Sequence, residues 1–448
     1  MTIHLLLAVL FSISLLLFLV LYWRLNAFLA LLLASIGFGL AAGTPFAAII
    51  ENISTGMGNT LAFVATIVGL GAILGAILEH SGGSQALAQF LLRALGERRA
   101  PLAFVLTGFL VAIPVFFDVA FVLLVPMVYA IGRRTERSLL YYAIPLLAGL
   151  ATTHAFIPPT PGPIAVADIL QAELGWVILL GFVVGLPTVG VAGLWWGKHV
   201  GDRFFVAAPL LDTRTDDAEK WLPPVGLILG LILLPIVLIL GHTGSKMLVA
   251  AGVWTANNWT EGLIFLGHPY VALLLSCLLA LYFLGYRRGL SSQALQKLAT
   301  QALAPAGTII LITGAGGVYK QMLVASGAGE LLAQVFVDFH LLPPLLAFVL
   351  AALIRILQGS ATVAMITAAG LLAPALPGLG LDAPQLALLV LSIAAGASTL
   401  SHVNDSGFWL VKEYLGIDEA TTLRTWTLMT VWLSLVALVV ILVLYWLV

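Results

Sequence analysis

The stretch LALLVLSIAAGASTLSHVNDSGFWLVKEY, residues 386–414, decides the fold class. It has no charged side chain up to Leu400, and then His402, Asn404 and Asp405 follow in close succession. An uncharged run of this kind is typical of a helix in lipid. A carboxylate at the end of such a run is costly unless it faces protein or water. We therefore interpret the stretch as a membrane span that is interrupted by a polar loop.

Composition extends this interpretation to the whole chain. Of its 448 residues, 61% are hydrophobic and only 9% are charged, whereas soluble domains carry roughly 25% charged residues. Apolar runs long enough to cross a bilayer as helices recur throughout, without the alternation of barrel strands. The chain is predicted to be an all-α polytopic membrane protein, with residues 4–22 as a retained first helix. The single cysteine, Cys277, excludes an internal disulfide, and the net charge of −1 gives no indication of nucleic-acid binding.

An internal repeat divides the chain. Residues of 69–90 recur at one constant offset within 314–335, where Gly69, Gly71, Ser81, Gly82, Ala88 and Gln89 become Gly314, Gly316, Ser326, Gly327, Ala333 and Gln334. The segments that follow differ in their flanks, which are basic at 93–99 and 132–138 but lack Lys and Arg at 338–344 and 376–385. Because basic loops stay in the cytoplasm, the two halves are predicted to be inverted repeats, as in secondary transporters.

Each repeat is expected to hold about five transmembrane helices and one re-entrant hairpin. The segment between Arg99 and Arg133 is shorter than the roughly 40 residues that two full crossings and a turn require. The predicted boundaries are a first repeat at 1–200, a cytoplasmic linker at 201–222 and a second repeat at 223–448. The predicted hairpins are at about 101–132 and 345–374, and the broken helices at about 139–172 and 386–412.

The two hairpin tips and the two helix breaks are expected to meet near the midplane and form the substrate site. In the second hairpin, the candidate substrate contacts are Gly359, Ser360, Ala361 and Thr362. Glycine permits a close backbone approach, and the hydroxyls can cap a helix or bind a ligand. Arg355 is a candidate partner for a carboxylate, but it could also pair with an acidic side chain of the protein.

The first repeat supplies three further candidates. Asp118 follows two phenylalanines at the first hairpin tip, where a carboxylate is a candidate proton carrier. Thr153 and His154 precede a proline-rich segment, IPPTPGP (157–163), through which no continuous helix can pass. For each of these residues, a capping or structural role is the alternative.

The matching break of the second repeat supplies His402, Asn404 and Asp405. Asn404 offers both a donor and an acceptor, which suits a hydroxylated ligand. Asp405 would repel an anion unless it is protonated or paired, so it is a candidate either for ion coupling or for a structural salt bridge to Lys412 or Lys320. The proton-coupling candidates are thus Asp118, His154 and Asp405.

Three segments resemble the gluconate permease family, the gluconate:proton symporters. They are THAFIPPTPGPIAVA (153–167), LIRILQGSATVAMITAAG (353–370) and SHVNDSGFWLVKEYL (401–415), with weaker similarity over nearly the whole chain. The family is grouped with the ion-transporter superfamily. The resemblance implies scaffold and transport domains, an elevator motion, a homodimer and a bacterial inner-membrane location. The chain departs from the family pattern at Asp118, where Glu is more common, and at Ser406, where Pro is more common.

The sequence therefore predicts a secondary transporter, not an enzyme, that imports gluconate or a similar hydroxylated carboxylate with protons. No cofactor and no metal site are expected, and protons versus sodium as the coupling ion stays open. A carrier of D-serine or another small amino acid is the alternative within the same class, and a channel is the alternative outside it. The predicted partners are a small sugar acid, membrane lipid and a second copy of the chain.

Overall fold

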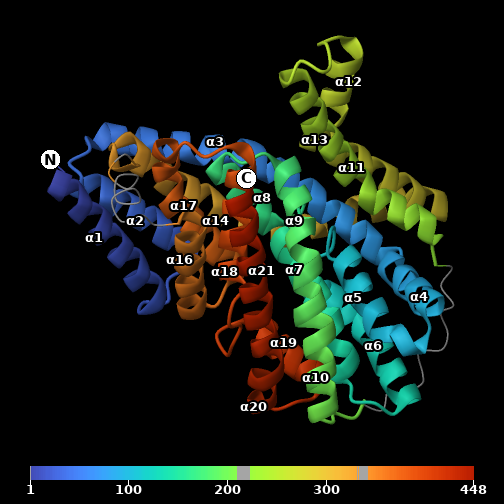
Figure 1. Cartoon of the computed structure of the whole chain (residues 1–448). Coiled ribbons are helices and arrows are strands. Elements are labelled where there is room, and N and C mark those ends of the chain that lie inside the picture. Colours follow the sequence, from blue (N-terminus) through green and yellow to red (C-terminus); the bar gives the residue numbers. More distant parts are fainter. Residues whose placement is uncertain (1, 209–221, 330, 332–341) are drawn as a thin grey trace.

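The computed structural model describes residues 2–208, 222–329, 331 and 342–448, and every described element is helical. Figure 1 shows long helices crossing a slab, with α1 and α2 at one end and α11 to α13 at the other. The elements of the first half are α1 (Thr2–Leu21), α2 (Ala27–Ala41), α3 (Phe46–His80), α4 (Gly83–Leu95), η1 (Glu97–Arg99), α5 (Ala100–Val111), α6 (Phe117–Thr135), α7 (Leu140–Phe156), α8 (Pro161–Leu170), α9 (Leu174–Val189), η2 (Gly190–Trp195) and α10 (Trp196–Arg203).

The second half is again helical in its described residues. Its elements are α11 (Val225–Ala250), α12 (Asn258–Leu266), α13 (Pro269–Ala280), η3 (Leu281–Gly285), η4 (Tyr286–Arg288), α14 (Ser292–Ala325), α16 (Pro343–Gln358), α17 (Ala361–Leu372), η5 (Ala373–Leu379), α18 (Ala383–Ala397), α19 (Ser406–Leu415), α20 (Glu419–Thr422), η6 (Leu423–Thr427) and α21 (Leu428–Leu447). The predicted linker, 201–222, lies mostly outside the described residues; its first residues belong to α10.

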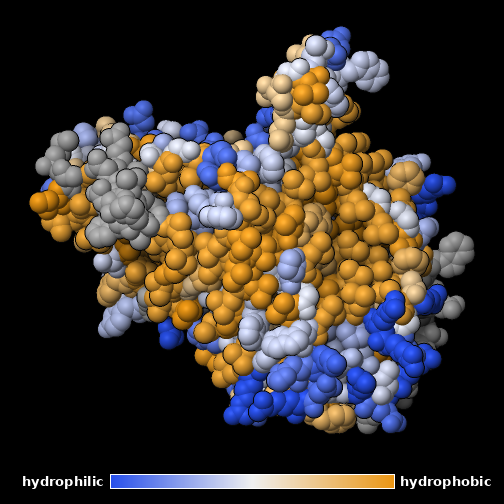
Figure 2. All heavy atoms as spheres, in the orientation of Figure 1, coloured by the Kyte–Doolittle hydropathy of each residue, from blue (hydrophilic) through white to orange (hydrophobic). Residues whose placement is uncertain are grey.

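Hydropathy identifies the membrane-crossing part of the molecule. Nine helical segments of the described chain are long and apolar enough to cross a bilayer. Figure 2 shows an apolar surface across the middle of one face, with hydrophilic residues gathered along its two margins. A band of this kind replaces water contacts by lipid contacts, so the chain is a multi-pass membrane protein.

The four interruptions expected from the sequence coincide with helix ends. Helices α5 and α6 are separated by residues 112–116, and α16 and α17 by Gly359 and Ser360. Residues 157–160 separate α7 from α8, and residues 398–405 separate α18 from α19. The two halves of the chain also pack in the same way. Helix α5 of the first hairpin packs along α7, and helix α16 of the second hairpin packs along α18.

Two helices are longer than a membrane span requires. Helix α3 runs from Phe46 to His80, and α14 runs from Ser292 to Ala325. At 1.5 Å per residue, each is about 50 Å long, which exceeds the roughly 30 Å of hydrocarbon. A hydropathy window detects only the part of a helix that lies in lipid, so it misses such polar extensions. The two helices pack against each other, and Gly56 of α3 touches the backbone of α14 at Val318.

Candidate functional site

A left-handed glycine forms the turn between α16 and α17. Gly359 ends α16 with φ +93°, a conformation that side chains disfavour. A Cβ at this position would collide with the main-chain oxygen of Asn404, so the turn and the 398–405 loop are in direct backbone contact. Ser360 then caps α17, with its Oγ accepting a hydrogen bond from the N–H of Val363 at 3.4 Å.

The 398–405 loop in turn caps the end of α16. The Ile356 carbonyl accepts hydrogen bonds from Nε2 of His402 at 3.0 Å and from Nδ2 of Asn404 at 2.9 Å. The last carbonyls of a helix have no donor within the helix, and these two side chains supply donors to one of them. Since a carbonyl can only accept, Nε2 carries the imidazole proton. The amide oxygen of Asn404 takes no part in this contact and could accept a hydrogen bond from a ligand.

An ion pair joins the same two segments. Nη2 of Arg355 lies 2.5 Å from Oδ2 of Asp405, and both side chains are largely withdrawn from solvent. The Ser401 hydroxyl also bonds to Oδ2, while Oδ1 accepts the Gly407 N–H at 3.2 Å and so caps α19. Asp405 therefore has three donors that stabilise its ionised form.

The suggested lysine partners of Asp405 are wrong. Lys412 pairs with Glu413 and Glu419, and Nζ of Lys320 donates to the Ile169 carbonyl at 2.6 Å. The cation that pairs with Asp405 is instead Arg355, from the last turn of α16 in the second hairpin. The pairing depends on a contact between segments far apart in the chain, which spacing in the sequence does not reveal.

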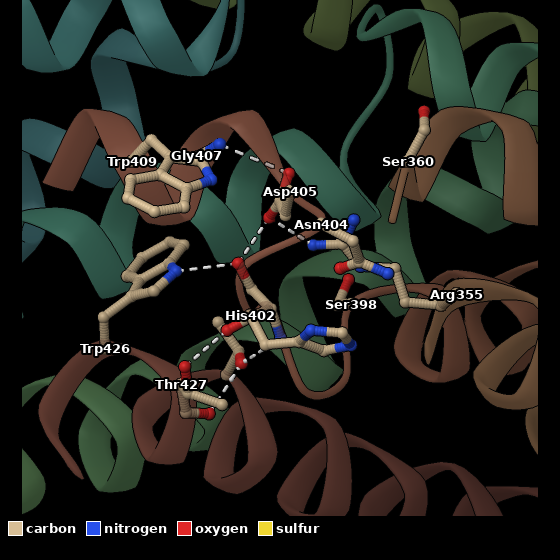
Figure 3. A network of polar contacts seen from close by, with 12 residues as sticks. Arg355, Ser360, Ser398, His402, Asn404, Asp405, Gly407, Trp409, Trp426 and Thr427 are labelled. Carbon is tan, nitrogen blue, oxygen red and sulfur yellow. Dashed lines mark hydrogen bonds and ion pairs between the residues drawn. The ribbon is translucent and has the colours of Figure 1, made fainter. Parts of the chain in front are cut away.

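The loop is anchored to the last helices of the chain. Nε1 of Trp426 donates to the Ser401 hydroxyl at 2.7 Å, as Figure 3 shows. Both main-chain groups of Ser401 are also bound, since its N–H donates to Thr430 at 3.0 Å and its carbonyl accepts from Thr427 at 2.5 Å. Trp426, Thr427 and Thr430 carry no motif of their own, so no pattern in the sequence indicates this role.

The first half places Asp118 and His154 beside the same space. Asp118 is exposed in the first turn of α6, and no described residue forms a hydrogen bond or ion pair with its carboxylate. His154 lies in the last turn of α7, where its ring is 6.5 Å from that of Phe116. Its Nδ1 is buried and has no partner among the described residues.

A cavity of about 590 Å³ joins these groups. The lining includes polar side chains and one glycine from both halves of the chain: Asp118, His154, Arg355, Gln358, Gly359, Ser360, Thr362, Ser398, Asn404 and Asp405. Ala361, Phe116, Phe117, Met365, Ser401 and Trp426 complete much of the wall. Of the residues expected from the sequence, Thr153 and His402 do not line it. Thr153 is fully buried and His402 is turned to the end of α16.

Four helices begin at this cavity. The first turns of α6, α8, α17 and α19 each contribute lining residues, namely Asp118, Pro161, Thr362 and Gly407. Helix N-termini carry partial positive charge and free N–H groups, so their convergence suits an anion. Arg355 adds a full charge, and its Nε and Nη1 are buried without a partner among the described residues. Within the described parts of the chain, no group of three or more His, Cys, Asp or Glu side chains could hold a metal ion.

A multi-pass helical protein with a polar, anion-suited cavity at its helix breaks has the architecture of a membrane transporter. Solved structures of transporters share its fold. The YdaH transporter of Alcanivorax borkumensis matches with a TM-score of 0.63 at 16% identity, covering 89% of this chain and 87% of that one. MtrF of Neisseria gonorrhoeae matches with a TM-score of 0.60 at 14% identity, covering 88% and 84%.

The chain belongs to the GntP family of permeases, whose signature it matches over residues 4–448. It is 41% identical to a low-affinity gluconate transporter of Escherichia coli, over 98% of each chain. It is also 41% identical to a gluconate permease of Pseudomonas aeruginosa, over 98% of this chain and 97% of that one. An inner membrane permease of Escherichia coli is 39% identical, over 96% of each chain. The protein is therefore a transporter and not an enzyme.

Proposed function

We propose that this protein imports gluconate, or a similar small hydroxylated carboxylate, across a bacterial inner membrane by proton symport. The observation that carries the proposal is Arg355, a buried cation that lines the cavity with donors left unpaired. An arginine with free donors recognises a carboxylate. The named activity of the full-length relatives supports the same substrate class.

The cavity has complementary groups for both ends of such a substrate. The carboxylate would bind at Arg355 and at the first N–H groups of α17, next to Ala361 and Thr362. The hydroxyls would bind the free oxygen of Asn404, the Ser360 and Ser398 hydroxyls and the side chain of Gln358. The Gln358 oxygen is buried without a partner among the described residues, so an aldonate hydroxyl would satisfy it.

Asp118 is the best candidate for the proton carrier. Asp405 is held as a carboxylate by Arg355, Ser401 and Gly407. A proton on Nδ1 of His154 would have no acceptor in its buried position. The Asp118 carboxylate has no such partner, lies in the same cavity and repels an anionic substrate until it is protonated. Binding of the anion and of the proton would then favour each other, which is the requirement for symport.

The transport cycle proposed here is an elevator motion of inverted repeats. The correspondence of α5 with α16 and of α7 with α18, together with the basic flanks of the first half, supports the repeat. The long helices α3 and α14 would belong to the scaffold, and the two hairpins with the broken helices would form the transport domain. A homodimer formed through the scaffold completes the proposal.

Proteoliposomes test this function directly. An inward proton gradient should drive accumulation of labelled gluconate above its external concentration, and this accumulation should stop when the gradient is dissipated. A thermal-shift panel of aldonates and small amino acids on purified protein then ranks the substrates. Gluconate flux that never exceeds equilibration would contradict symport.

A carrier of small amino acids remains a second candidate because of one observation. The unpaired carboxylate of Asp118 could bind an ammonium group while Arg355 binds the carboxylate. Competition of labelled gluconate uptake by D-serine separates the two functions. Strong competition by D-serine, and none by other aldonates, would favour the amino acid.

A further inference from the structure

A second cavity adjoins the substrate cavity. It has a volume of about 220 Å³ and lies between α3, α14 and the segment that links α5 to α6. Phe116, Val119 and Pro305 line both cavities, so these three side chains form a shared wall. Asp118 stands on the same first turn of α6 as Val119, on the substrate side.

The second cavity lies toward the end of the molecule that carries basic residues. Its lining includes Ala76 and Glu79 from the last turns of α3, and Leu298 and Gln301 from the first turns of α14. Arg287 and Arg288 directly precede α14 in the chain, and basic flanks mark the cytoplasmic side. The cavity therefore extends from the shared wall toward the cytoplasm.

Glu79 is the titratable group of this cavity. Among its described lining residues, no other side chain can take up a proton, and most of the rest are apolar. The Glu79 carboxylate forms no ion pair with any described residue. Two basic residues adjoin this end of α3, namely His80, which is exposed, and Arg288, whose Nη1 donates to the Ser81 carbonyl at 3.0 Å. A carboxylate near the end of a membrane helix, inside a cavity, is a functional candidate by default.

We propose that this cavity is the cytoplasmic proton exit and that Glu79 receives the coupling proton from Asp118. The inference rests on the proposed proton symport. In the step, protonated Asp118 gives its proton through water to the Glu79 carboxylate, so that Asp118 becomes the carboxylate and Glu79 the acid. Glu79 then releases the proton to cytoplasmic water. The cavity is far larger than the roughly 10–15 Å³ that one water requires, and the side chains of Glu79 and Gln301 in its lining offer polar partners to such a water.

Loss of the proton restores the negative charge of Asp118, and this charge links the relay to substrate release. Once Asp118 is ionised again, it repels the bound anion, which promotes substrate release on the same side. Phe116, Val119 and Pro305 narrow the junction between the two spaces, so that water can pass a proton there while the larger anion is held back. Proton release and substrate release are thereby coupled through one turn of α6.

The test compares Glu79→Gln with Glu51→Gln, an exposed glutamate on the same helix that lines neither cavity. In proteoliposomes, the initial rate of proton-driven gluconate uptake by E79Q should fall on the order of 10²-fold, a loss typical for a group that transfers protons. Substrate-induced acidification of the lumen should disappear with it. Gluconate counterflow at equal pH should persist, because the exchange of one gluconate for another requires no net release of a proton. E51Q should resemble the wild type in all three assays.

Two outcomes would overturn the relay. Normal proton-driven uptake by E79Q would show that the proton leaves elsewhere, and loss of counterflow would show that Glu79 serves the movement of the carrier instead. Failure of the proposed function gives a different result, since the wild type itself would then not respond to the proton gradient.

Discussion

The guanidinium of Arg355 has one ionic partner among the described residues and is largely withdrawn from solvent. Its pairing with Asp405 joins α16 to the start of α19, and its Nε and Nη1 are buried without a partner among the described residues. Removing one partner of a buried pair leaves an uncompensated charge, whereas an exposed pair contributes little. Stability and substrate recognition therefore depend on the same side chain.

The first prediction concerns this ion pair. Arg355→Gln should lower the free energy of unfolding by about 3–5 kcal/mol, because Asp405 is left buried and unpaired. Lys412→Gln removes a surface cation beside Glu413 and Glu419, and should change the free energy of unfolding far less. Thermal unfolding in detergent measures both. Equal shifts in the two variants would contradict a special role for the buried pair, while partial recovery in R355Q/D405N would support it.

The second prediction concerns the proton carrier. Asp118→Asn should retain gluconate counterflow but lose accumulation driven by a proton gradient, since an amide cannot release a proton. Asp118→Glu keeps the carboxylate and should retain some accumulation. Measuring both fluxes in proteoliposomes separates coupling from binding. Undiminished accumulation by D118N would remove Asp118 from the coupling mechanism.

At the scale of elements, the site is made by helix ends. The turn between α16 and α17 contacts the loop between α18 and α19, and each caps or pairs with the other. The loop is also fixed to α21 through Thr430 and to η6 through Trp426. Such mutual capping makes the position of one interruption dependent on the other.

The third prediction uses two left-handed glycines. Gly359→Ala places a methyl group against the Asn404 backbone at φ +93°, whereas Gly380→Ala, at φ +60°, meets nothing within 4 Å. The strained backbone alone should cost G380A about 1–2 kcal/mol. G359A should lose more stability and also bind gluconate more weakly, because the turn must separate from the loop. Thermal unfolding with and without gluconate tests this, and equal ligand-induced stabilisation of both variants would contradict it.

At the scale of the molecule, the charge distribution fixes the orientation in the membrane. The basic segments around residues 93–99, 132–138 and 286–298 are predicted to be cytoplasmic. Figure 1 shows that α12 extends beyond the helices that surround it, on the side reached by the end of α11. The link before α12 is therefore expected to lie outside the cell.

The fourth prediction tests this orientation. An impermeant maleimide should label Ala256→Cys in intact cells, but should label Gln293→Cys only after permeabilisation. Both positions are exposed, and the native Cys277 is buried, so the wild type provides the unlabelled background. Labelling of Q293C in intact cells would invert the topology on which the direction of transport depends.

The class of fold, the helix breaks and nine of the residues that line the cavity were predicted from the sequence. Lipid favours apolar helices, so a charged side chain, a cluster of prolines or a short polar turn within such a run marks an interruption. The segments around Asp118, His154, Ser360 and Asn404 were recognisable for this reason.

Which of these groups meet depends on the packing of the helices. The Arg355–Asp405 pair, the anchoring of Ser401 by Trp426 and the turning of His402 away from the cavity all depend on contacts between distant segments. The separation of Glu79 from Asp118 by a shared apolar wall does so as well. Local patterns follow from the period of a helix and the properties of lipid, whereas the choice of partner depends on how the helices pack around one cavity.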